Sequence, residues 1–247
     1  MKGDEQYVIV IDSLVKSYGK KEVLKGLSLK VKKGEVFTFI GKNGAGKSTT
    51  IDCMVGLKDA DQGNILINGF DIVNDAIQAK KQFGYVPSEP VTYEMMSGRE
   101  YLEFIASAYA IDEDTFETNY ETLRKQLEMT TVDMNRKIRE YSHGMQQKVC
   151  LMASLIHDPL IWVLDEPTVG LDIMVYETLL NMIRDFAEAG KTVFVTSHNI
   201  DLVARVADRV AIINEGKVAT LIDLNEEEEK REKLSQIFLD TYNGDIK

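Results

Sequence analysis

The fold is decided by the stretch Val36-Phe37-Thr38-Phe39-Ile40-Gly41-Lys42-Asn43-Gly44-Ala45-Gly46-Lys47-Ser48-Thr49. Its apolar part, Val36 to Ile40, predicts a buried strand, and the residues from Lys47 onward predict a helix. The turn between them has the pattern G-x-x-x-x-G-K-S, and the order strand, glycine-rich loop, helix is the setting that a phosphate-binding loop requires. A glycine-rich surface turn is the plainer alternative, but it would not require Lys and Ser at these positions. The stretch therefore predicts a nucleoside triphosphate site.

Each part of this loop suits a part of a bound triphosphate. Glycines let the backbone turn tightly, so that successive N–H groups and the positive end of the following helix face phosphate oxygens. Lys47 adds a positive charge near the β- and γ-phosphates, and the Ser48 hydroxyl suits Mg²⁺. The predicted nucleotide contacts in the loop are Gly41, Asn43, Gly44, Ala45, Gly46, Lys47, Ser48 and Thr49.

The composition is that of an ordinary soluble globular protein, with 44% hydrophobic and 28% charged residues among 247. A formal net charge of −11 argues against nucleic acid as a partner, because binding to the phosphate backbone needs clustered Lys and Arg. Cys53 and Cys150 form no C-x-x-C pair, and each lies in a segment that is predicted to be helical. We therefore expect buried free thiols in a reducing compartment.

The sequence shows no membrane or secretion signal of its own. The segment Met1 to Gln6 lacks the apolar core of a signal peptide, and no stretch approaches the ~18 consecutive apolar residues of a membrane span. We expect a cytoplasmic protein that reaches the inner face of the cell membrane only through a partner.

The order of elements indicates an α/β nucleotide-binding core with two additions. Strands are predicted at Tyr7–Ile11 and Val23–Val31, and a hairpin around Asn64 to Gly69, which suggests an antiparallel β lobe. Helical spacing of apolar residues without strand signals predicts an inserted helical subdomain. The predicted boundaries are 1–91 for the first part of the core with its β lobe, 92–158 for the helical subdomain, 159–224 for the second part of the core, and 225–247 for a charged helix or tail.

An apolar strand over 160–164 ends in the adjacent carboxylates Asp165 and Glu166. A strand ending in this pair is a common surface turn by itself, but after a phosphate loop it is much more specific. Asp165 can reach a bound Mg²⁺, and Glu166 can polarise an attacking water. The residues 168–171 then lead to Asp172, which can cap the next helix.

Polar residues also lie at the ends of other predicted elements. His198 follows a strand over 192–196 and would lie beside Asp165, at the edge where α/β sheets bind ligands. Ser142 and Gly144 lie at the start of a predicted helix, where they can meet phosphate oxygens. These positions extend the predicted triphosphate site beyond the loop.

Together these motifs resemble those of the ATPase subunits of ABC transporters, over about Tyr7 to Thr220, and among them the bacterial exporter-type subunits. The resemblance implies ATP and Mg²⁺ as ligands and ATP hydrolysis coupled to transport. It also implies that Tyr18 stacks on adenine and that the signature residues Ser142, Gly144 and Met145 contact the γ-phosphate. Ser48 and Asp165 would bind the metal, Glu166 would be the catalytic base, and His198 would be the γ-phosphate sensor. Asp172 would belong to a loop at the dimer interface.

The resemblance also implies partners. Two copies, or two similar subunits, would pair head to tail on ATP binding, so that the phosphate loop of one and the signature of the other enclose each ATP. The helical region from Thr92 to Arg139 would contact a separate integral-membrane permease that exports a drug, peptide or ion. No nucleic acid partner is expected.

The chain departs from the usual motifs of this family in two places. Its signature is Tyr141-Ser142-His143-Gly144-Met145 in place of Leu-Ser-Gly-Gly-Gln, a form similar to that of bacterial exporter-type subunits. After Tyr85-Val86-Pro87, Ser88 stands where a glutamine usually approaches Mg²⁺. We expect Ser88 to contact the metal through a water, with substitution by Glu89 or slow hydrolysis as the alternatives.

A soluble ABC-type ATPase that acts in assembly or regulation, for example in iron–sulfur cluster assembly, is the alternative function. The segment Tyr85 to Pro90, which leads into the helical region, resembles the permease-coupling segment of transporters and favours transport. The transported substrate is not expected to be readable from this chain, because the permease contacts it.

Overall fold

The computed structural model describes residues 6–168, 171–225 and 228–243. The elements in chain order are β1 (Tyr7–Tyr18), β2 (Lys21–Lys32), β3 (Val36–Ile40), α1 (Lys47–Met54), β4 (Gln62–Ile67), β5 (Phe70–Asp71), α2 (Ala76–Lys80), β6 (Phe83–Val86), α3 (Gly98–Ala108), α4 (Glu113–Gln126), α5 (Thr131–Asn135), a 3₁₀ turn (Ile138–Glu140), α6 (His143–Leu155), β7 (Ile161–Asp165), α7 (Ile173–Glu188), β8 (Thr192–Ser197), α8 (Ile200–Val206), β9 (Arg209–Asn214), β10 (Lys217–Asp223), α9 (Glu228–Glu232) and α10 (Leu234–Asn243). Within these described ranges, no helix combines the length and the apolar character needed to cross a membrane.

The centre of the molecule is a sheet with the strand order β10-β9-β3-β8-β7-β6. β3 is parallel to β8 and β9, and β7 is parallel to β6 and β8. Every residue of β3, β7 and β8 is buried, as expected for parallel strands covered on both faces. Since these strands are parallel neighbours, their carboxyl ends lie at one edge of the sheet. The phosphate loop, Glu166 and His198 follow the strands at that edge.

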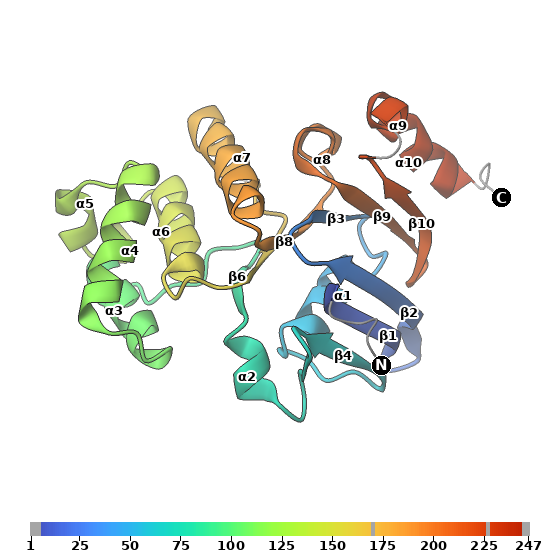
Figure 1. Ribbon diagram of the computed structural model, residues 1–247, viewed down its shortest axis with the longest axis horizontal. Helices are drawn as coiled ribbons and strands as arrows, with labels where there is room; N and C mark the ends of the chain where they lie inside the picture. The colour runs from blue at the N-terminus through green and yellow to red at the C-terminus, as the bar shows by residue number, and fades with distance from the viewer. Residues whose placement is uncertain (1–5, 169–170, 226–227, 244–247) are drawn as a thin grey trace.

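Alternate side chains of the central strands enter two hydrophobic cores. Trp162 and Leu164 of β7 pack in the core that includes α7, α8 and the helical region. Ile161 and Val163, on the other face, pack in the core that includes α1 and the antiparallel strands. Figure 1 shows α1 on one side of the sheet and α7 and α8 on the other. The sheet is therefore the layer on which both cores are built.

The second sheet has the order β2-β1-β4-β5 and is antiparallel. β1 continues to Tyr18, well past the predicted end at Ile11. The pairing with β2 shifts register between Ile11 and Leu14, where Ser13 has a φ of 52°. A bulge of this kind breaks the alternation of apolar residues, so the sequence pattern stops before the strand does. The hairpin predicted around Asn64 to Gly69 is confirmed as β4 and β5.

The helices α3 to α6 form a lobe at the side of the molecule away from β10 (Figure 1). Ser97 and Thr130 each form a reciprocal capping box at the start of α3 and α5, which fixes where these helices begin. Tyr101 and Tyr120 are buried within the lobe. The predicted fold class, an α/β core with an antiparallel β lobe and an inserted helical subdomain, is confirmed.

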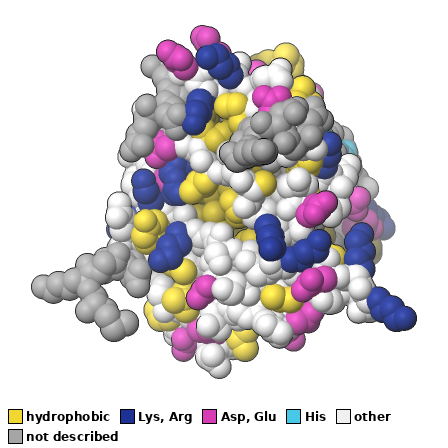
Figure 2. Space-filling view, turned by 90° about the vertical axis from the view of Figure 1, so that its right-hand side faces the viewer, with side chains coloured by type: hydrophobic (Ala, Val, Ile, Leu, Met, Phe, Trp, Pro, Cys, Tyr) yellow, Lys and Arg dark blue, Asp and Glu magenta, His cyan; other side chains and the backbone are white. Residues whose placement is uncertain are grey.

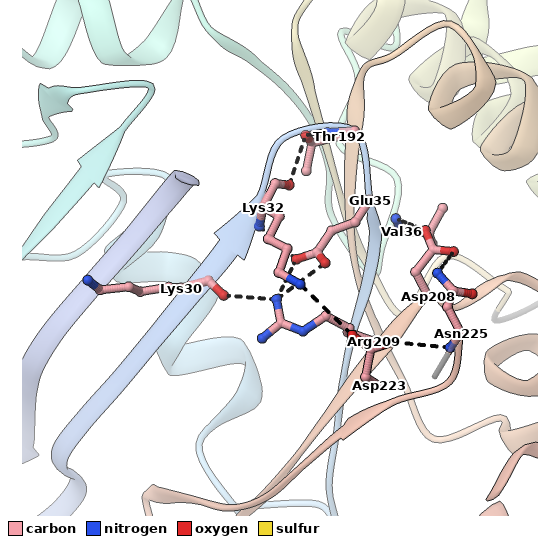
Figure 3. Close-up of polar contacts among 10 residues, drawn as sticks. Lys30, Lys32, Glu35, Val36, Thr192, Asp208, Arg209, Asp223 and Asn225 are labelled. Atoms are coloured by element: carbon pink, nitrogen blue, oxygen red, sulfur yellow. Dashed lines mark hydrogen bonds and ion pairs between the residues drawn. The ribbon is translucent and has the colours of Figure 1, made fainter. Parts of the chain in front are cut away.

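A buried ion pair joins the two sheets at the end of β3 that is remote from the phosphate loop (Figure 3). Arg209 at the start of β9 contacts Glu35 at 2.9 Å, and the two side chains are 11% and 8% exposed. Glu35 also accepts a hydrogen bond from the Lys32 N–H (2.7 Å), and Arg209 donates to the Lys30 carbonyl of β2 (3.4 Å). Burial raises the pKa of Glu35, while Lys32 and Arg209 act against that rise. The pair thus fixes β2 beside β9.

We expect the variant Arg209→Met to lower the free energy of unfolding by about 3 kcal/mol, because Glu35 would remain buried without its cation. Arg205→Met is the matched control, since Arg205 pairs with Glu177 at a site where the side chains are 34% and 45% exposed, and it should cost much less stability than Arg209→Met. Urea unfolding of the two variants measures the difference. Equal, small losses would show that the Glu35–Arg209 pair does not stabilise the joint between the sheets.

Candidate active site

The phosphate loop has a conformation that depends on its glycines. Gly44 and Gly46 have φ angles of 81° and 117°, in the left-handed region that favours glycine. A Cβ at Gly46 would lie 2.8 Å from Leu24 Cδ2, so the second sheet leaves no room for a side chain there. The Lys47 side chain is 6% exposed, and its Nζ donates to the Gly41 carbonyl at 2.7 Å. The loop therefore closes around the lysine ammonium group.

Asp165 lies at the carboxyl end of β7 and is 4% exposed. The Thr196 hydroxyl of β8 donates to Asp165 Oδ1 at 2.5 Å. Burial raises the pKa of Asp165, and the hydrogen bond from Thr196 opposes that rise. A buried carboxylate beside the loop fits a divalent cation, which would offset its charge.

Ser48 is exposed at the start of α1, so its hydroxyl is open to a ligand. Among the described residues, no group of three or more His, Cys, Asp or Glu side chains could hold a metal. A cation here would therefore need oxygens from phosphate and water in addition to those of Ser48 and Asp165, which is the usual mode for Mg²⁺.

Glu166 connects the loop to the end of β8. Its N–H donates to the carbonyl and the hydroxyl oxygens of Thr196, both at 3.1 Å. One carboxylate oxygen, Oε1, lies 3.4 Å from Lys47 Nζ. The other, Oε2, accepts hydrogen bonds from His198 through Nδ1 (2.8 Å) and the backbone N–H (3.1 Å). The structure thus brings together Lys47, Glu166 and His198, which come from three segments far apart in the sequence.

The signature residues lie in the helical lobe, at the start of α6 (Figure 1). Ser142 is exposed and caps this helix, since its Oγ accepts a hydrogen bond from the Met145 N–H at 3.3 Å. Gly144 lies in the first turn. None of these residues makes a hydrogen bond or ion pair with the phosphate loop in the part of the chain that the structure describes. The single chain therefore does not bring the signature to its own loop.

Three further predicted positions lie at the periphery. Tyr18 ends β1 and is 43% exposed, with Nζ of Lys16 and Lys58 lying 5.8 and 5.4 Å from its ring centroid. Ser88 and Glu89 are both exposed, in the segment between β6 and α3. Their side chains are open to solvent.

The prediction that Asp172 caps the following helix is confirmed. Its Oδ1 accepts hydrogen bonds from the N–H groups of Met174 and Val175, both at 3.0 Å. Residues 169 and 170 of the predicted interface loop lie outside the described residues.

Two contacts of the site were not assigned from the sequence. Thr196 was identified only as part of a strand, although its hydroxyl contacts both Asp165 and Glu166. Gly216, in the turn between β9 and β10, donates its N–H to the Ala45 carbonyl of the loop at 3.2 Å. The only sequence signals for these roles were the strand end and the turn glycine, and neither reveals its partner.

A hollow of about 990 Å³ lies on a different part of the molecule, lined by residues of β1, β2, β4 and β10 that include Val10, Leu66 and Leu221. Figure 2 faces the side that carries β10, where hydrophobic side chains gather near the middle with Lys and Arg around them. None of the predicted nucleotide contacts lines this hollow. It is therefore separate from the phosphate loop.

The loop, the parallel sheet and the carboxylates at its edge define a P-loop ATPase. Residues 24–169 match the family model described as ABC transporter, and the chain belongs to this family of ATP-binding, ATP-hydrolysing subunits. A solved structure described as the ATP binding subunit of an ABC transporter superposes with a TM-score of 0.88 at 27% identity, covering 95% of this chain and 99% of that one.

The curated relatives support the same assignment over most of their length. The chain is 35% identical to the linearmycin resistance ATP-binding protein LnrL of Bacillus subtilis (strain 168) over 85% of this chain and 67% of that protein. It is 34% identical to the SkfA peptide export ATP-binding protein SkfE of the same organism, over 90% and 92%. It is 30% identical to the lantibiotic transport ATP-binding protein SrtF of Streptococcus pyogenes, over 94% and 96%. These relatives favour the transporter interpretation over the assembly-factor alternative.

Replacing Thr196 by Val should lower kcat for ATP hydrolysis about tenfold, since the variant keeps the shape of the side chain but removes the hydroxyl that contacts Asp165 and Glu166. Because the Thr196 hydrogen bond lowers the pKa of Asp165, its loss should move the acidic limb of the pH–rate profile to higher pH. The stability cost should be about 1–3 kcal/mol.

Thr192→Val is the matched control, because Thr192 lies at the opposite end of β8 and its hydroxyl accepts a hydrogen bond from the Gly34 N–H. This variant should lose stability but keep the pH–rate profile. If both variants leave the profile unchanged, Thr196 has only a structural role.

Proposed function

We propose that this chain is the ATP-hydrolysing subunit of an exporter and works with a separate membrane permease that moves an antibiotic or a peptide. The names of three relatives support export, since they refer to linearmycin resistance, peptide export and lantibiotic transport. Each of these relatives aligns with at least 85% of this chain. The observation that carries the energy-coupling role is the position of Glu166 between Lys47 and His198.

The geometry of Glu166 suggests how hydrolysis proceeds. Two donors of His198 orient Oε2, while Oε1 lies near the Lys47 ammonium. A γ-phosphate would compete with Oε1 for this ammonium, because both are anionic partners of one cation. ATP would therefore take Lys47 and leave Oε1 free to orient or deprotonate the water that attacks the γ-phosphate.

The proposed Mg²⁺ ligands are Ser48 and Asp165, with Ser88 acting through a water. When bound, this ion would offset charge on the phosphates. The proposed nucleotide contacts in the loop are Gly41, Asn43, Gly44, Ala45, Gly46, Lys47, Ser48 and Thr49. The exposed ring of Tyr18 would stack on adenine. The ammonium groups of Lys16 and Lys58, which lie near this ring, would attract the negatively charged nucleotide.

A second copy would complete each site. Ser142 accepts a hydrogen bond from Met145 through its oxygen, so its hydroxyl proton remains available for a phosphate of the other subunit. Gly144 lies in the first turn of α6, where backbone N–H groups have no helical acceptor. We propose that ATP binding joins two subunits head to tail in this way and that hydrolysis separates them.

The proposed permease contact is a cleft of about 370 Å³ between β6 and the helical lobe. Apolar side chains line most of it, and Val91 at its edge is 70% exposed. Next to it, Tyr93 is 55% exposed and packs against Tyr101 of the lining and Phe104. An exposed apolar surface of this kind marks an interaction site. Binding there would place the chain at the cytoplasmic face of the cell membrane.

Glu166→Gln should bind ATP, hydrolyse it about 10²–10³ times more slowly than the wild type, and elute as a dimer when ATP is present. The amide keeps the size of the side chain but cannot accept the proton of the attacking water. Glu188→Gln, at an exposed position at the end of α7, is the control and should retain activity. Hydrolysis by Glu166→Gln at the wild-type rate would remove Glu166 from the mechanism.

Val91→Lys should abolish binding to the permease without changing the ATPase activity of the isolated subunit, because a charge would be placed at the edge of the apolar cleft. The measurement is pull-down of the multi-spanning membrane protein that copurifies with the tagged wild-type chain. Val73→Lys is the control, since Val73 is 68% exposed but lies outside the cleft. Equal recovery with both variants would place the permease contact elsewhere.

A further inference from the structure

The last described helix, α10, ends against the phosphate loop. Leu234 at its start is fully buried, and Ile237, Phe238 and Tyr242 pack against the larger core. Figure 1 shows α10 beside β9 and β10, at the end of the core sheet away from the helical lobe. Because these apolar contacts repeat along one face of the helix, they fix where Tyr242 lies.

The Tyr242 hydroxyl lies between the loop and β9. It accepts a hydrogen bond from the Lys42 N–H at 2.8 Å and donates one to the Ile213 carbonyl. The parallel pairing of β3 with β9 ends at Ile40 and Ile212, two residues before Lys42 and one before Ile213. The tyrosine oxygen therefore connects the two backbones at the point where their own ladder stops.

The space around this hydroxyl is closely filled. A Cβ at Gly41 would lie 2.5 Å from Ile213 Cγ2 and 3.1 Å from the Tyr242 oxygen. The Lys42 ammonium lies 4.3 Å from the Tyr242 ring centroid, and the Phe238 ring packs edge-on at 5.0 Å. Burial also raises the pKa of Tyr242, so the hydroxyl stays protonated and keeps its donor role.

We propose that Tyr242 is a positioning residue for the phosphate loop, and that docking of α10 and binding of ATP therefore favour each other. The hydroxyl fixes the Lys42 peptide group near the start of the loop, where Lys47 also contacts the Gly41 carbonyl, while Gly216 fixes Ala45 in the middle of the loop. A loop whose N–H groups are already oriented loses less conformational freedom when it binds phosphates. The coupling is reciprocal, so ATP stabilises the docked helix by the same factor.

The test compares Tyr242→Phe with Tyr176→Phe in the full chain. Tyr176 is the control, because its hydroxyl also makes a hydrogen bond, here to the Asp201 side chain at 3.0 Å, but it lies on α7 away from the loop. Loss of the Tyr242 hydrogen bonds should raise the Kd for ATP about 3–10-fold, the range expected for such bonds. The kcat at saturating ATP should stay within about twofold, and the control should bind ATP as the wild type does.

Tyr242→Ala provides a second measurement, since it also removes the ring beneath Lys42. In the wild type, ATP should slow amide hydrogen exchange in the peptide that spans 234–243, and this protection should be lost in Tyr242→Ala and kept in Tyr176→Phe. Wild-type Kd and unchanged ATP protection in both Tyr242 variants, with only a lower Tm, would overturn the proposal. If the wild type itself failed to bind ATP, the proposed function would be at fault instead.

Discussion

The site depends on the parallel pairing of β8 with β3 on one side and β7 on the other. This register places Ile40 opposite Ser197 and Asp165 opposite Thr196, so the residues that follow each strand emerge at one edge. A shift of one residue would turn the side chains of β8 to the opposite face. The contacts of Thr196 with Asp165 and Glu166 would then be lost, together with the position of His198.

The two ends of the core sheet differ in what stabilises them. At the amino end of β3, the two sheets are joined by the ion pair between Glu35 and Arg209, which is buried away from solvent. At the carboxyl end, the loop is contacted mainly by backbone hydrogen bonds and by Lys47. Segments from the last third of the chain supply several of these contacts, including Gly216 and Tyr242. The loop near the amino terminus is therefore completed by the carboxyl-terminal elements.

Local patterns made much of the fold predictable from the sequence. The apolar run Val36 to Ile40, the glycine-rich loop and the carboxylates at the carboxyl end of β7 are contiguous signals, and each predicted its own structure. Contacts between distant segments were not predictable in the same way, because nothing near Thr196 or Tyr242 in the sequence indicates its partner. The extent of β1 was missed for a different reason, since the bulge at Ser13 interrupts the alternation that defines a strand. The signature at Ser142 was recognisable, but its proposed phosphate contact needs another subunit.

Glu166 has a backbone φ of 48°, a left-handed conformation that is unfavourable for residues with a Cβ. The hydrogen bonds from its N–H to Thr196 keep it there, at a cost of about 1–3 kcal/mol. Glycine would adopt this backbone geometry without strain, yet it would remove the only carboxylate that reaches both Lys47 and His198 among the described residues. Selection for thermal robustness alone would thus favour glycine at this position. A strained backbone at the residue that we propose to act on the attacking water is the trade between stability and activity expected of a catalytic group.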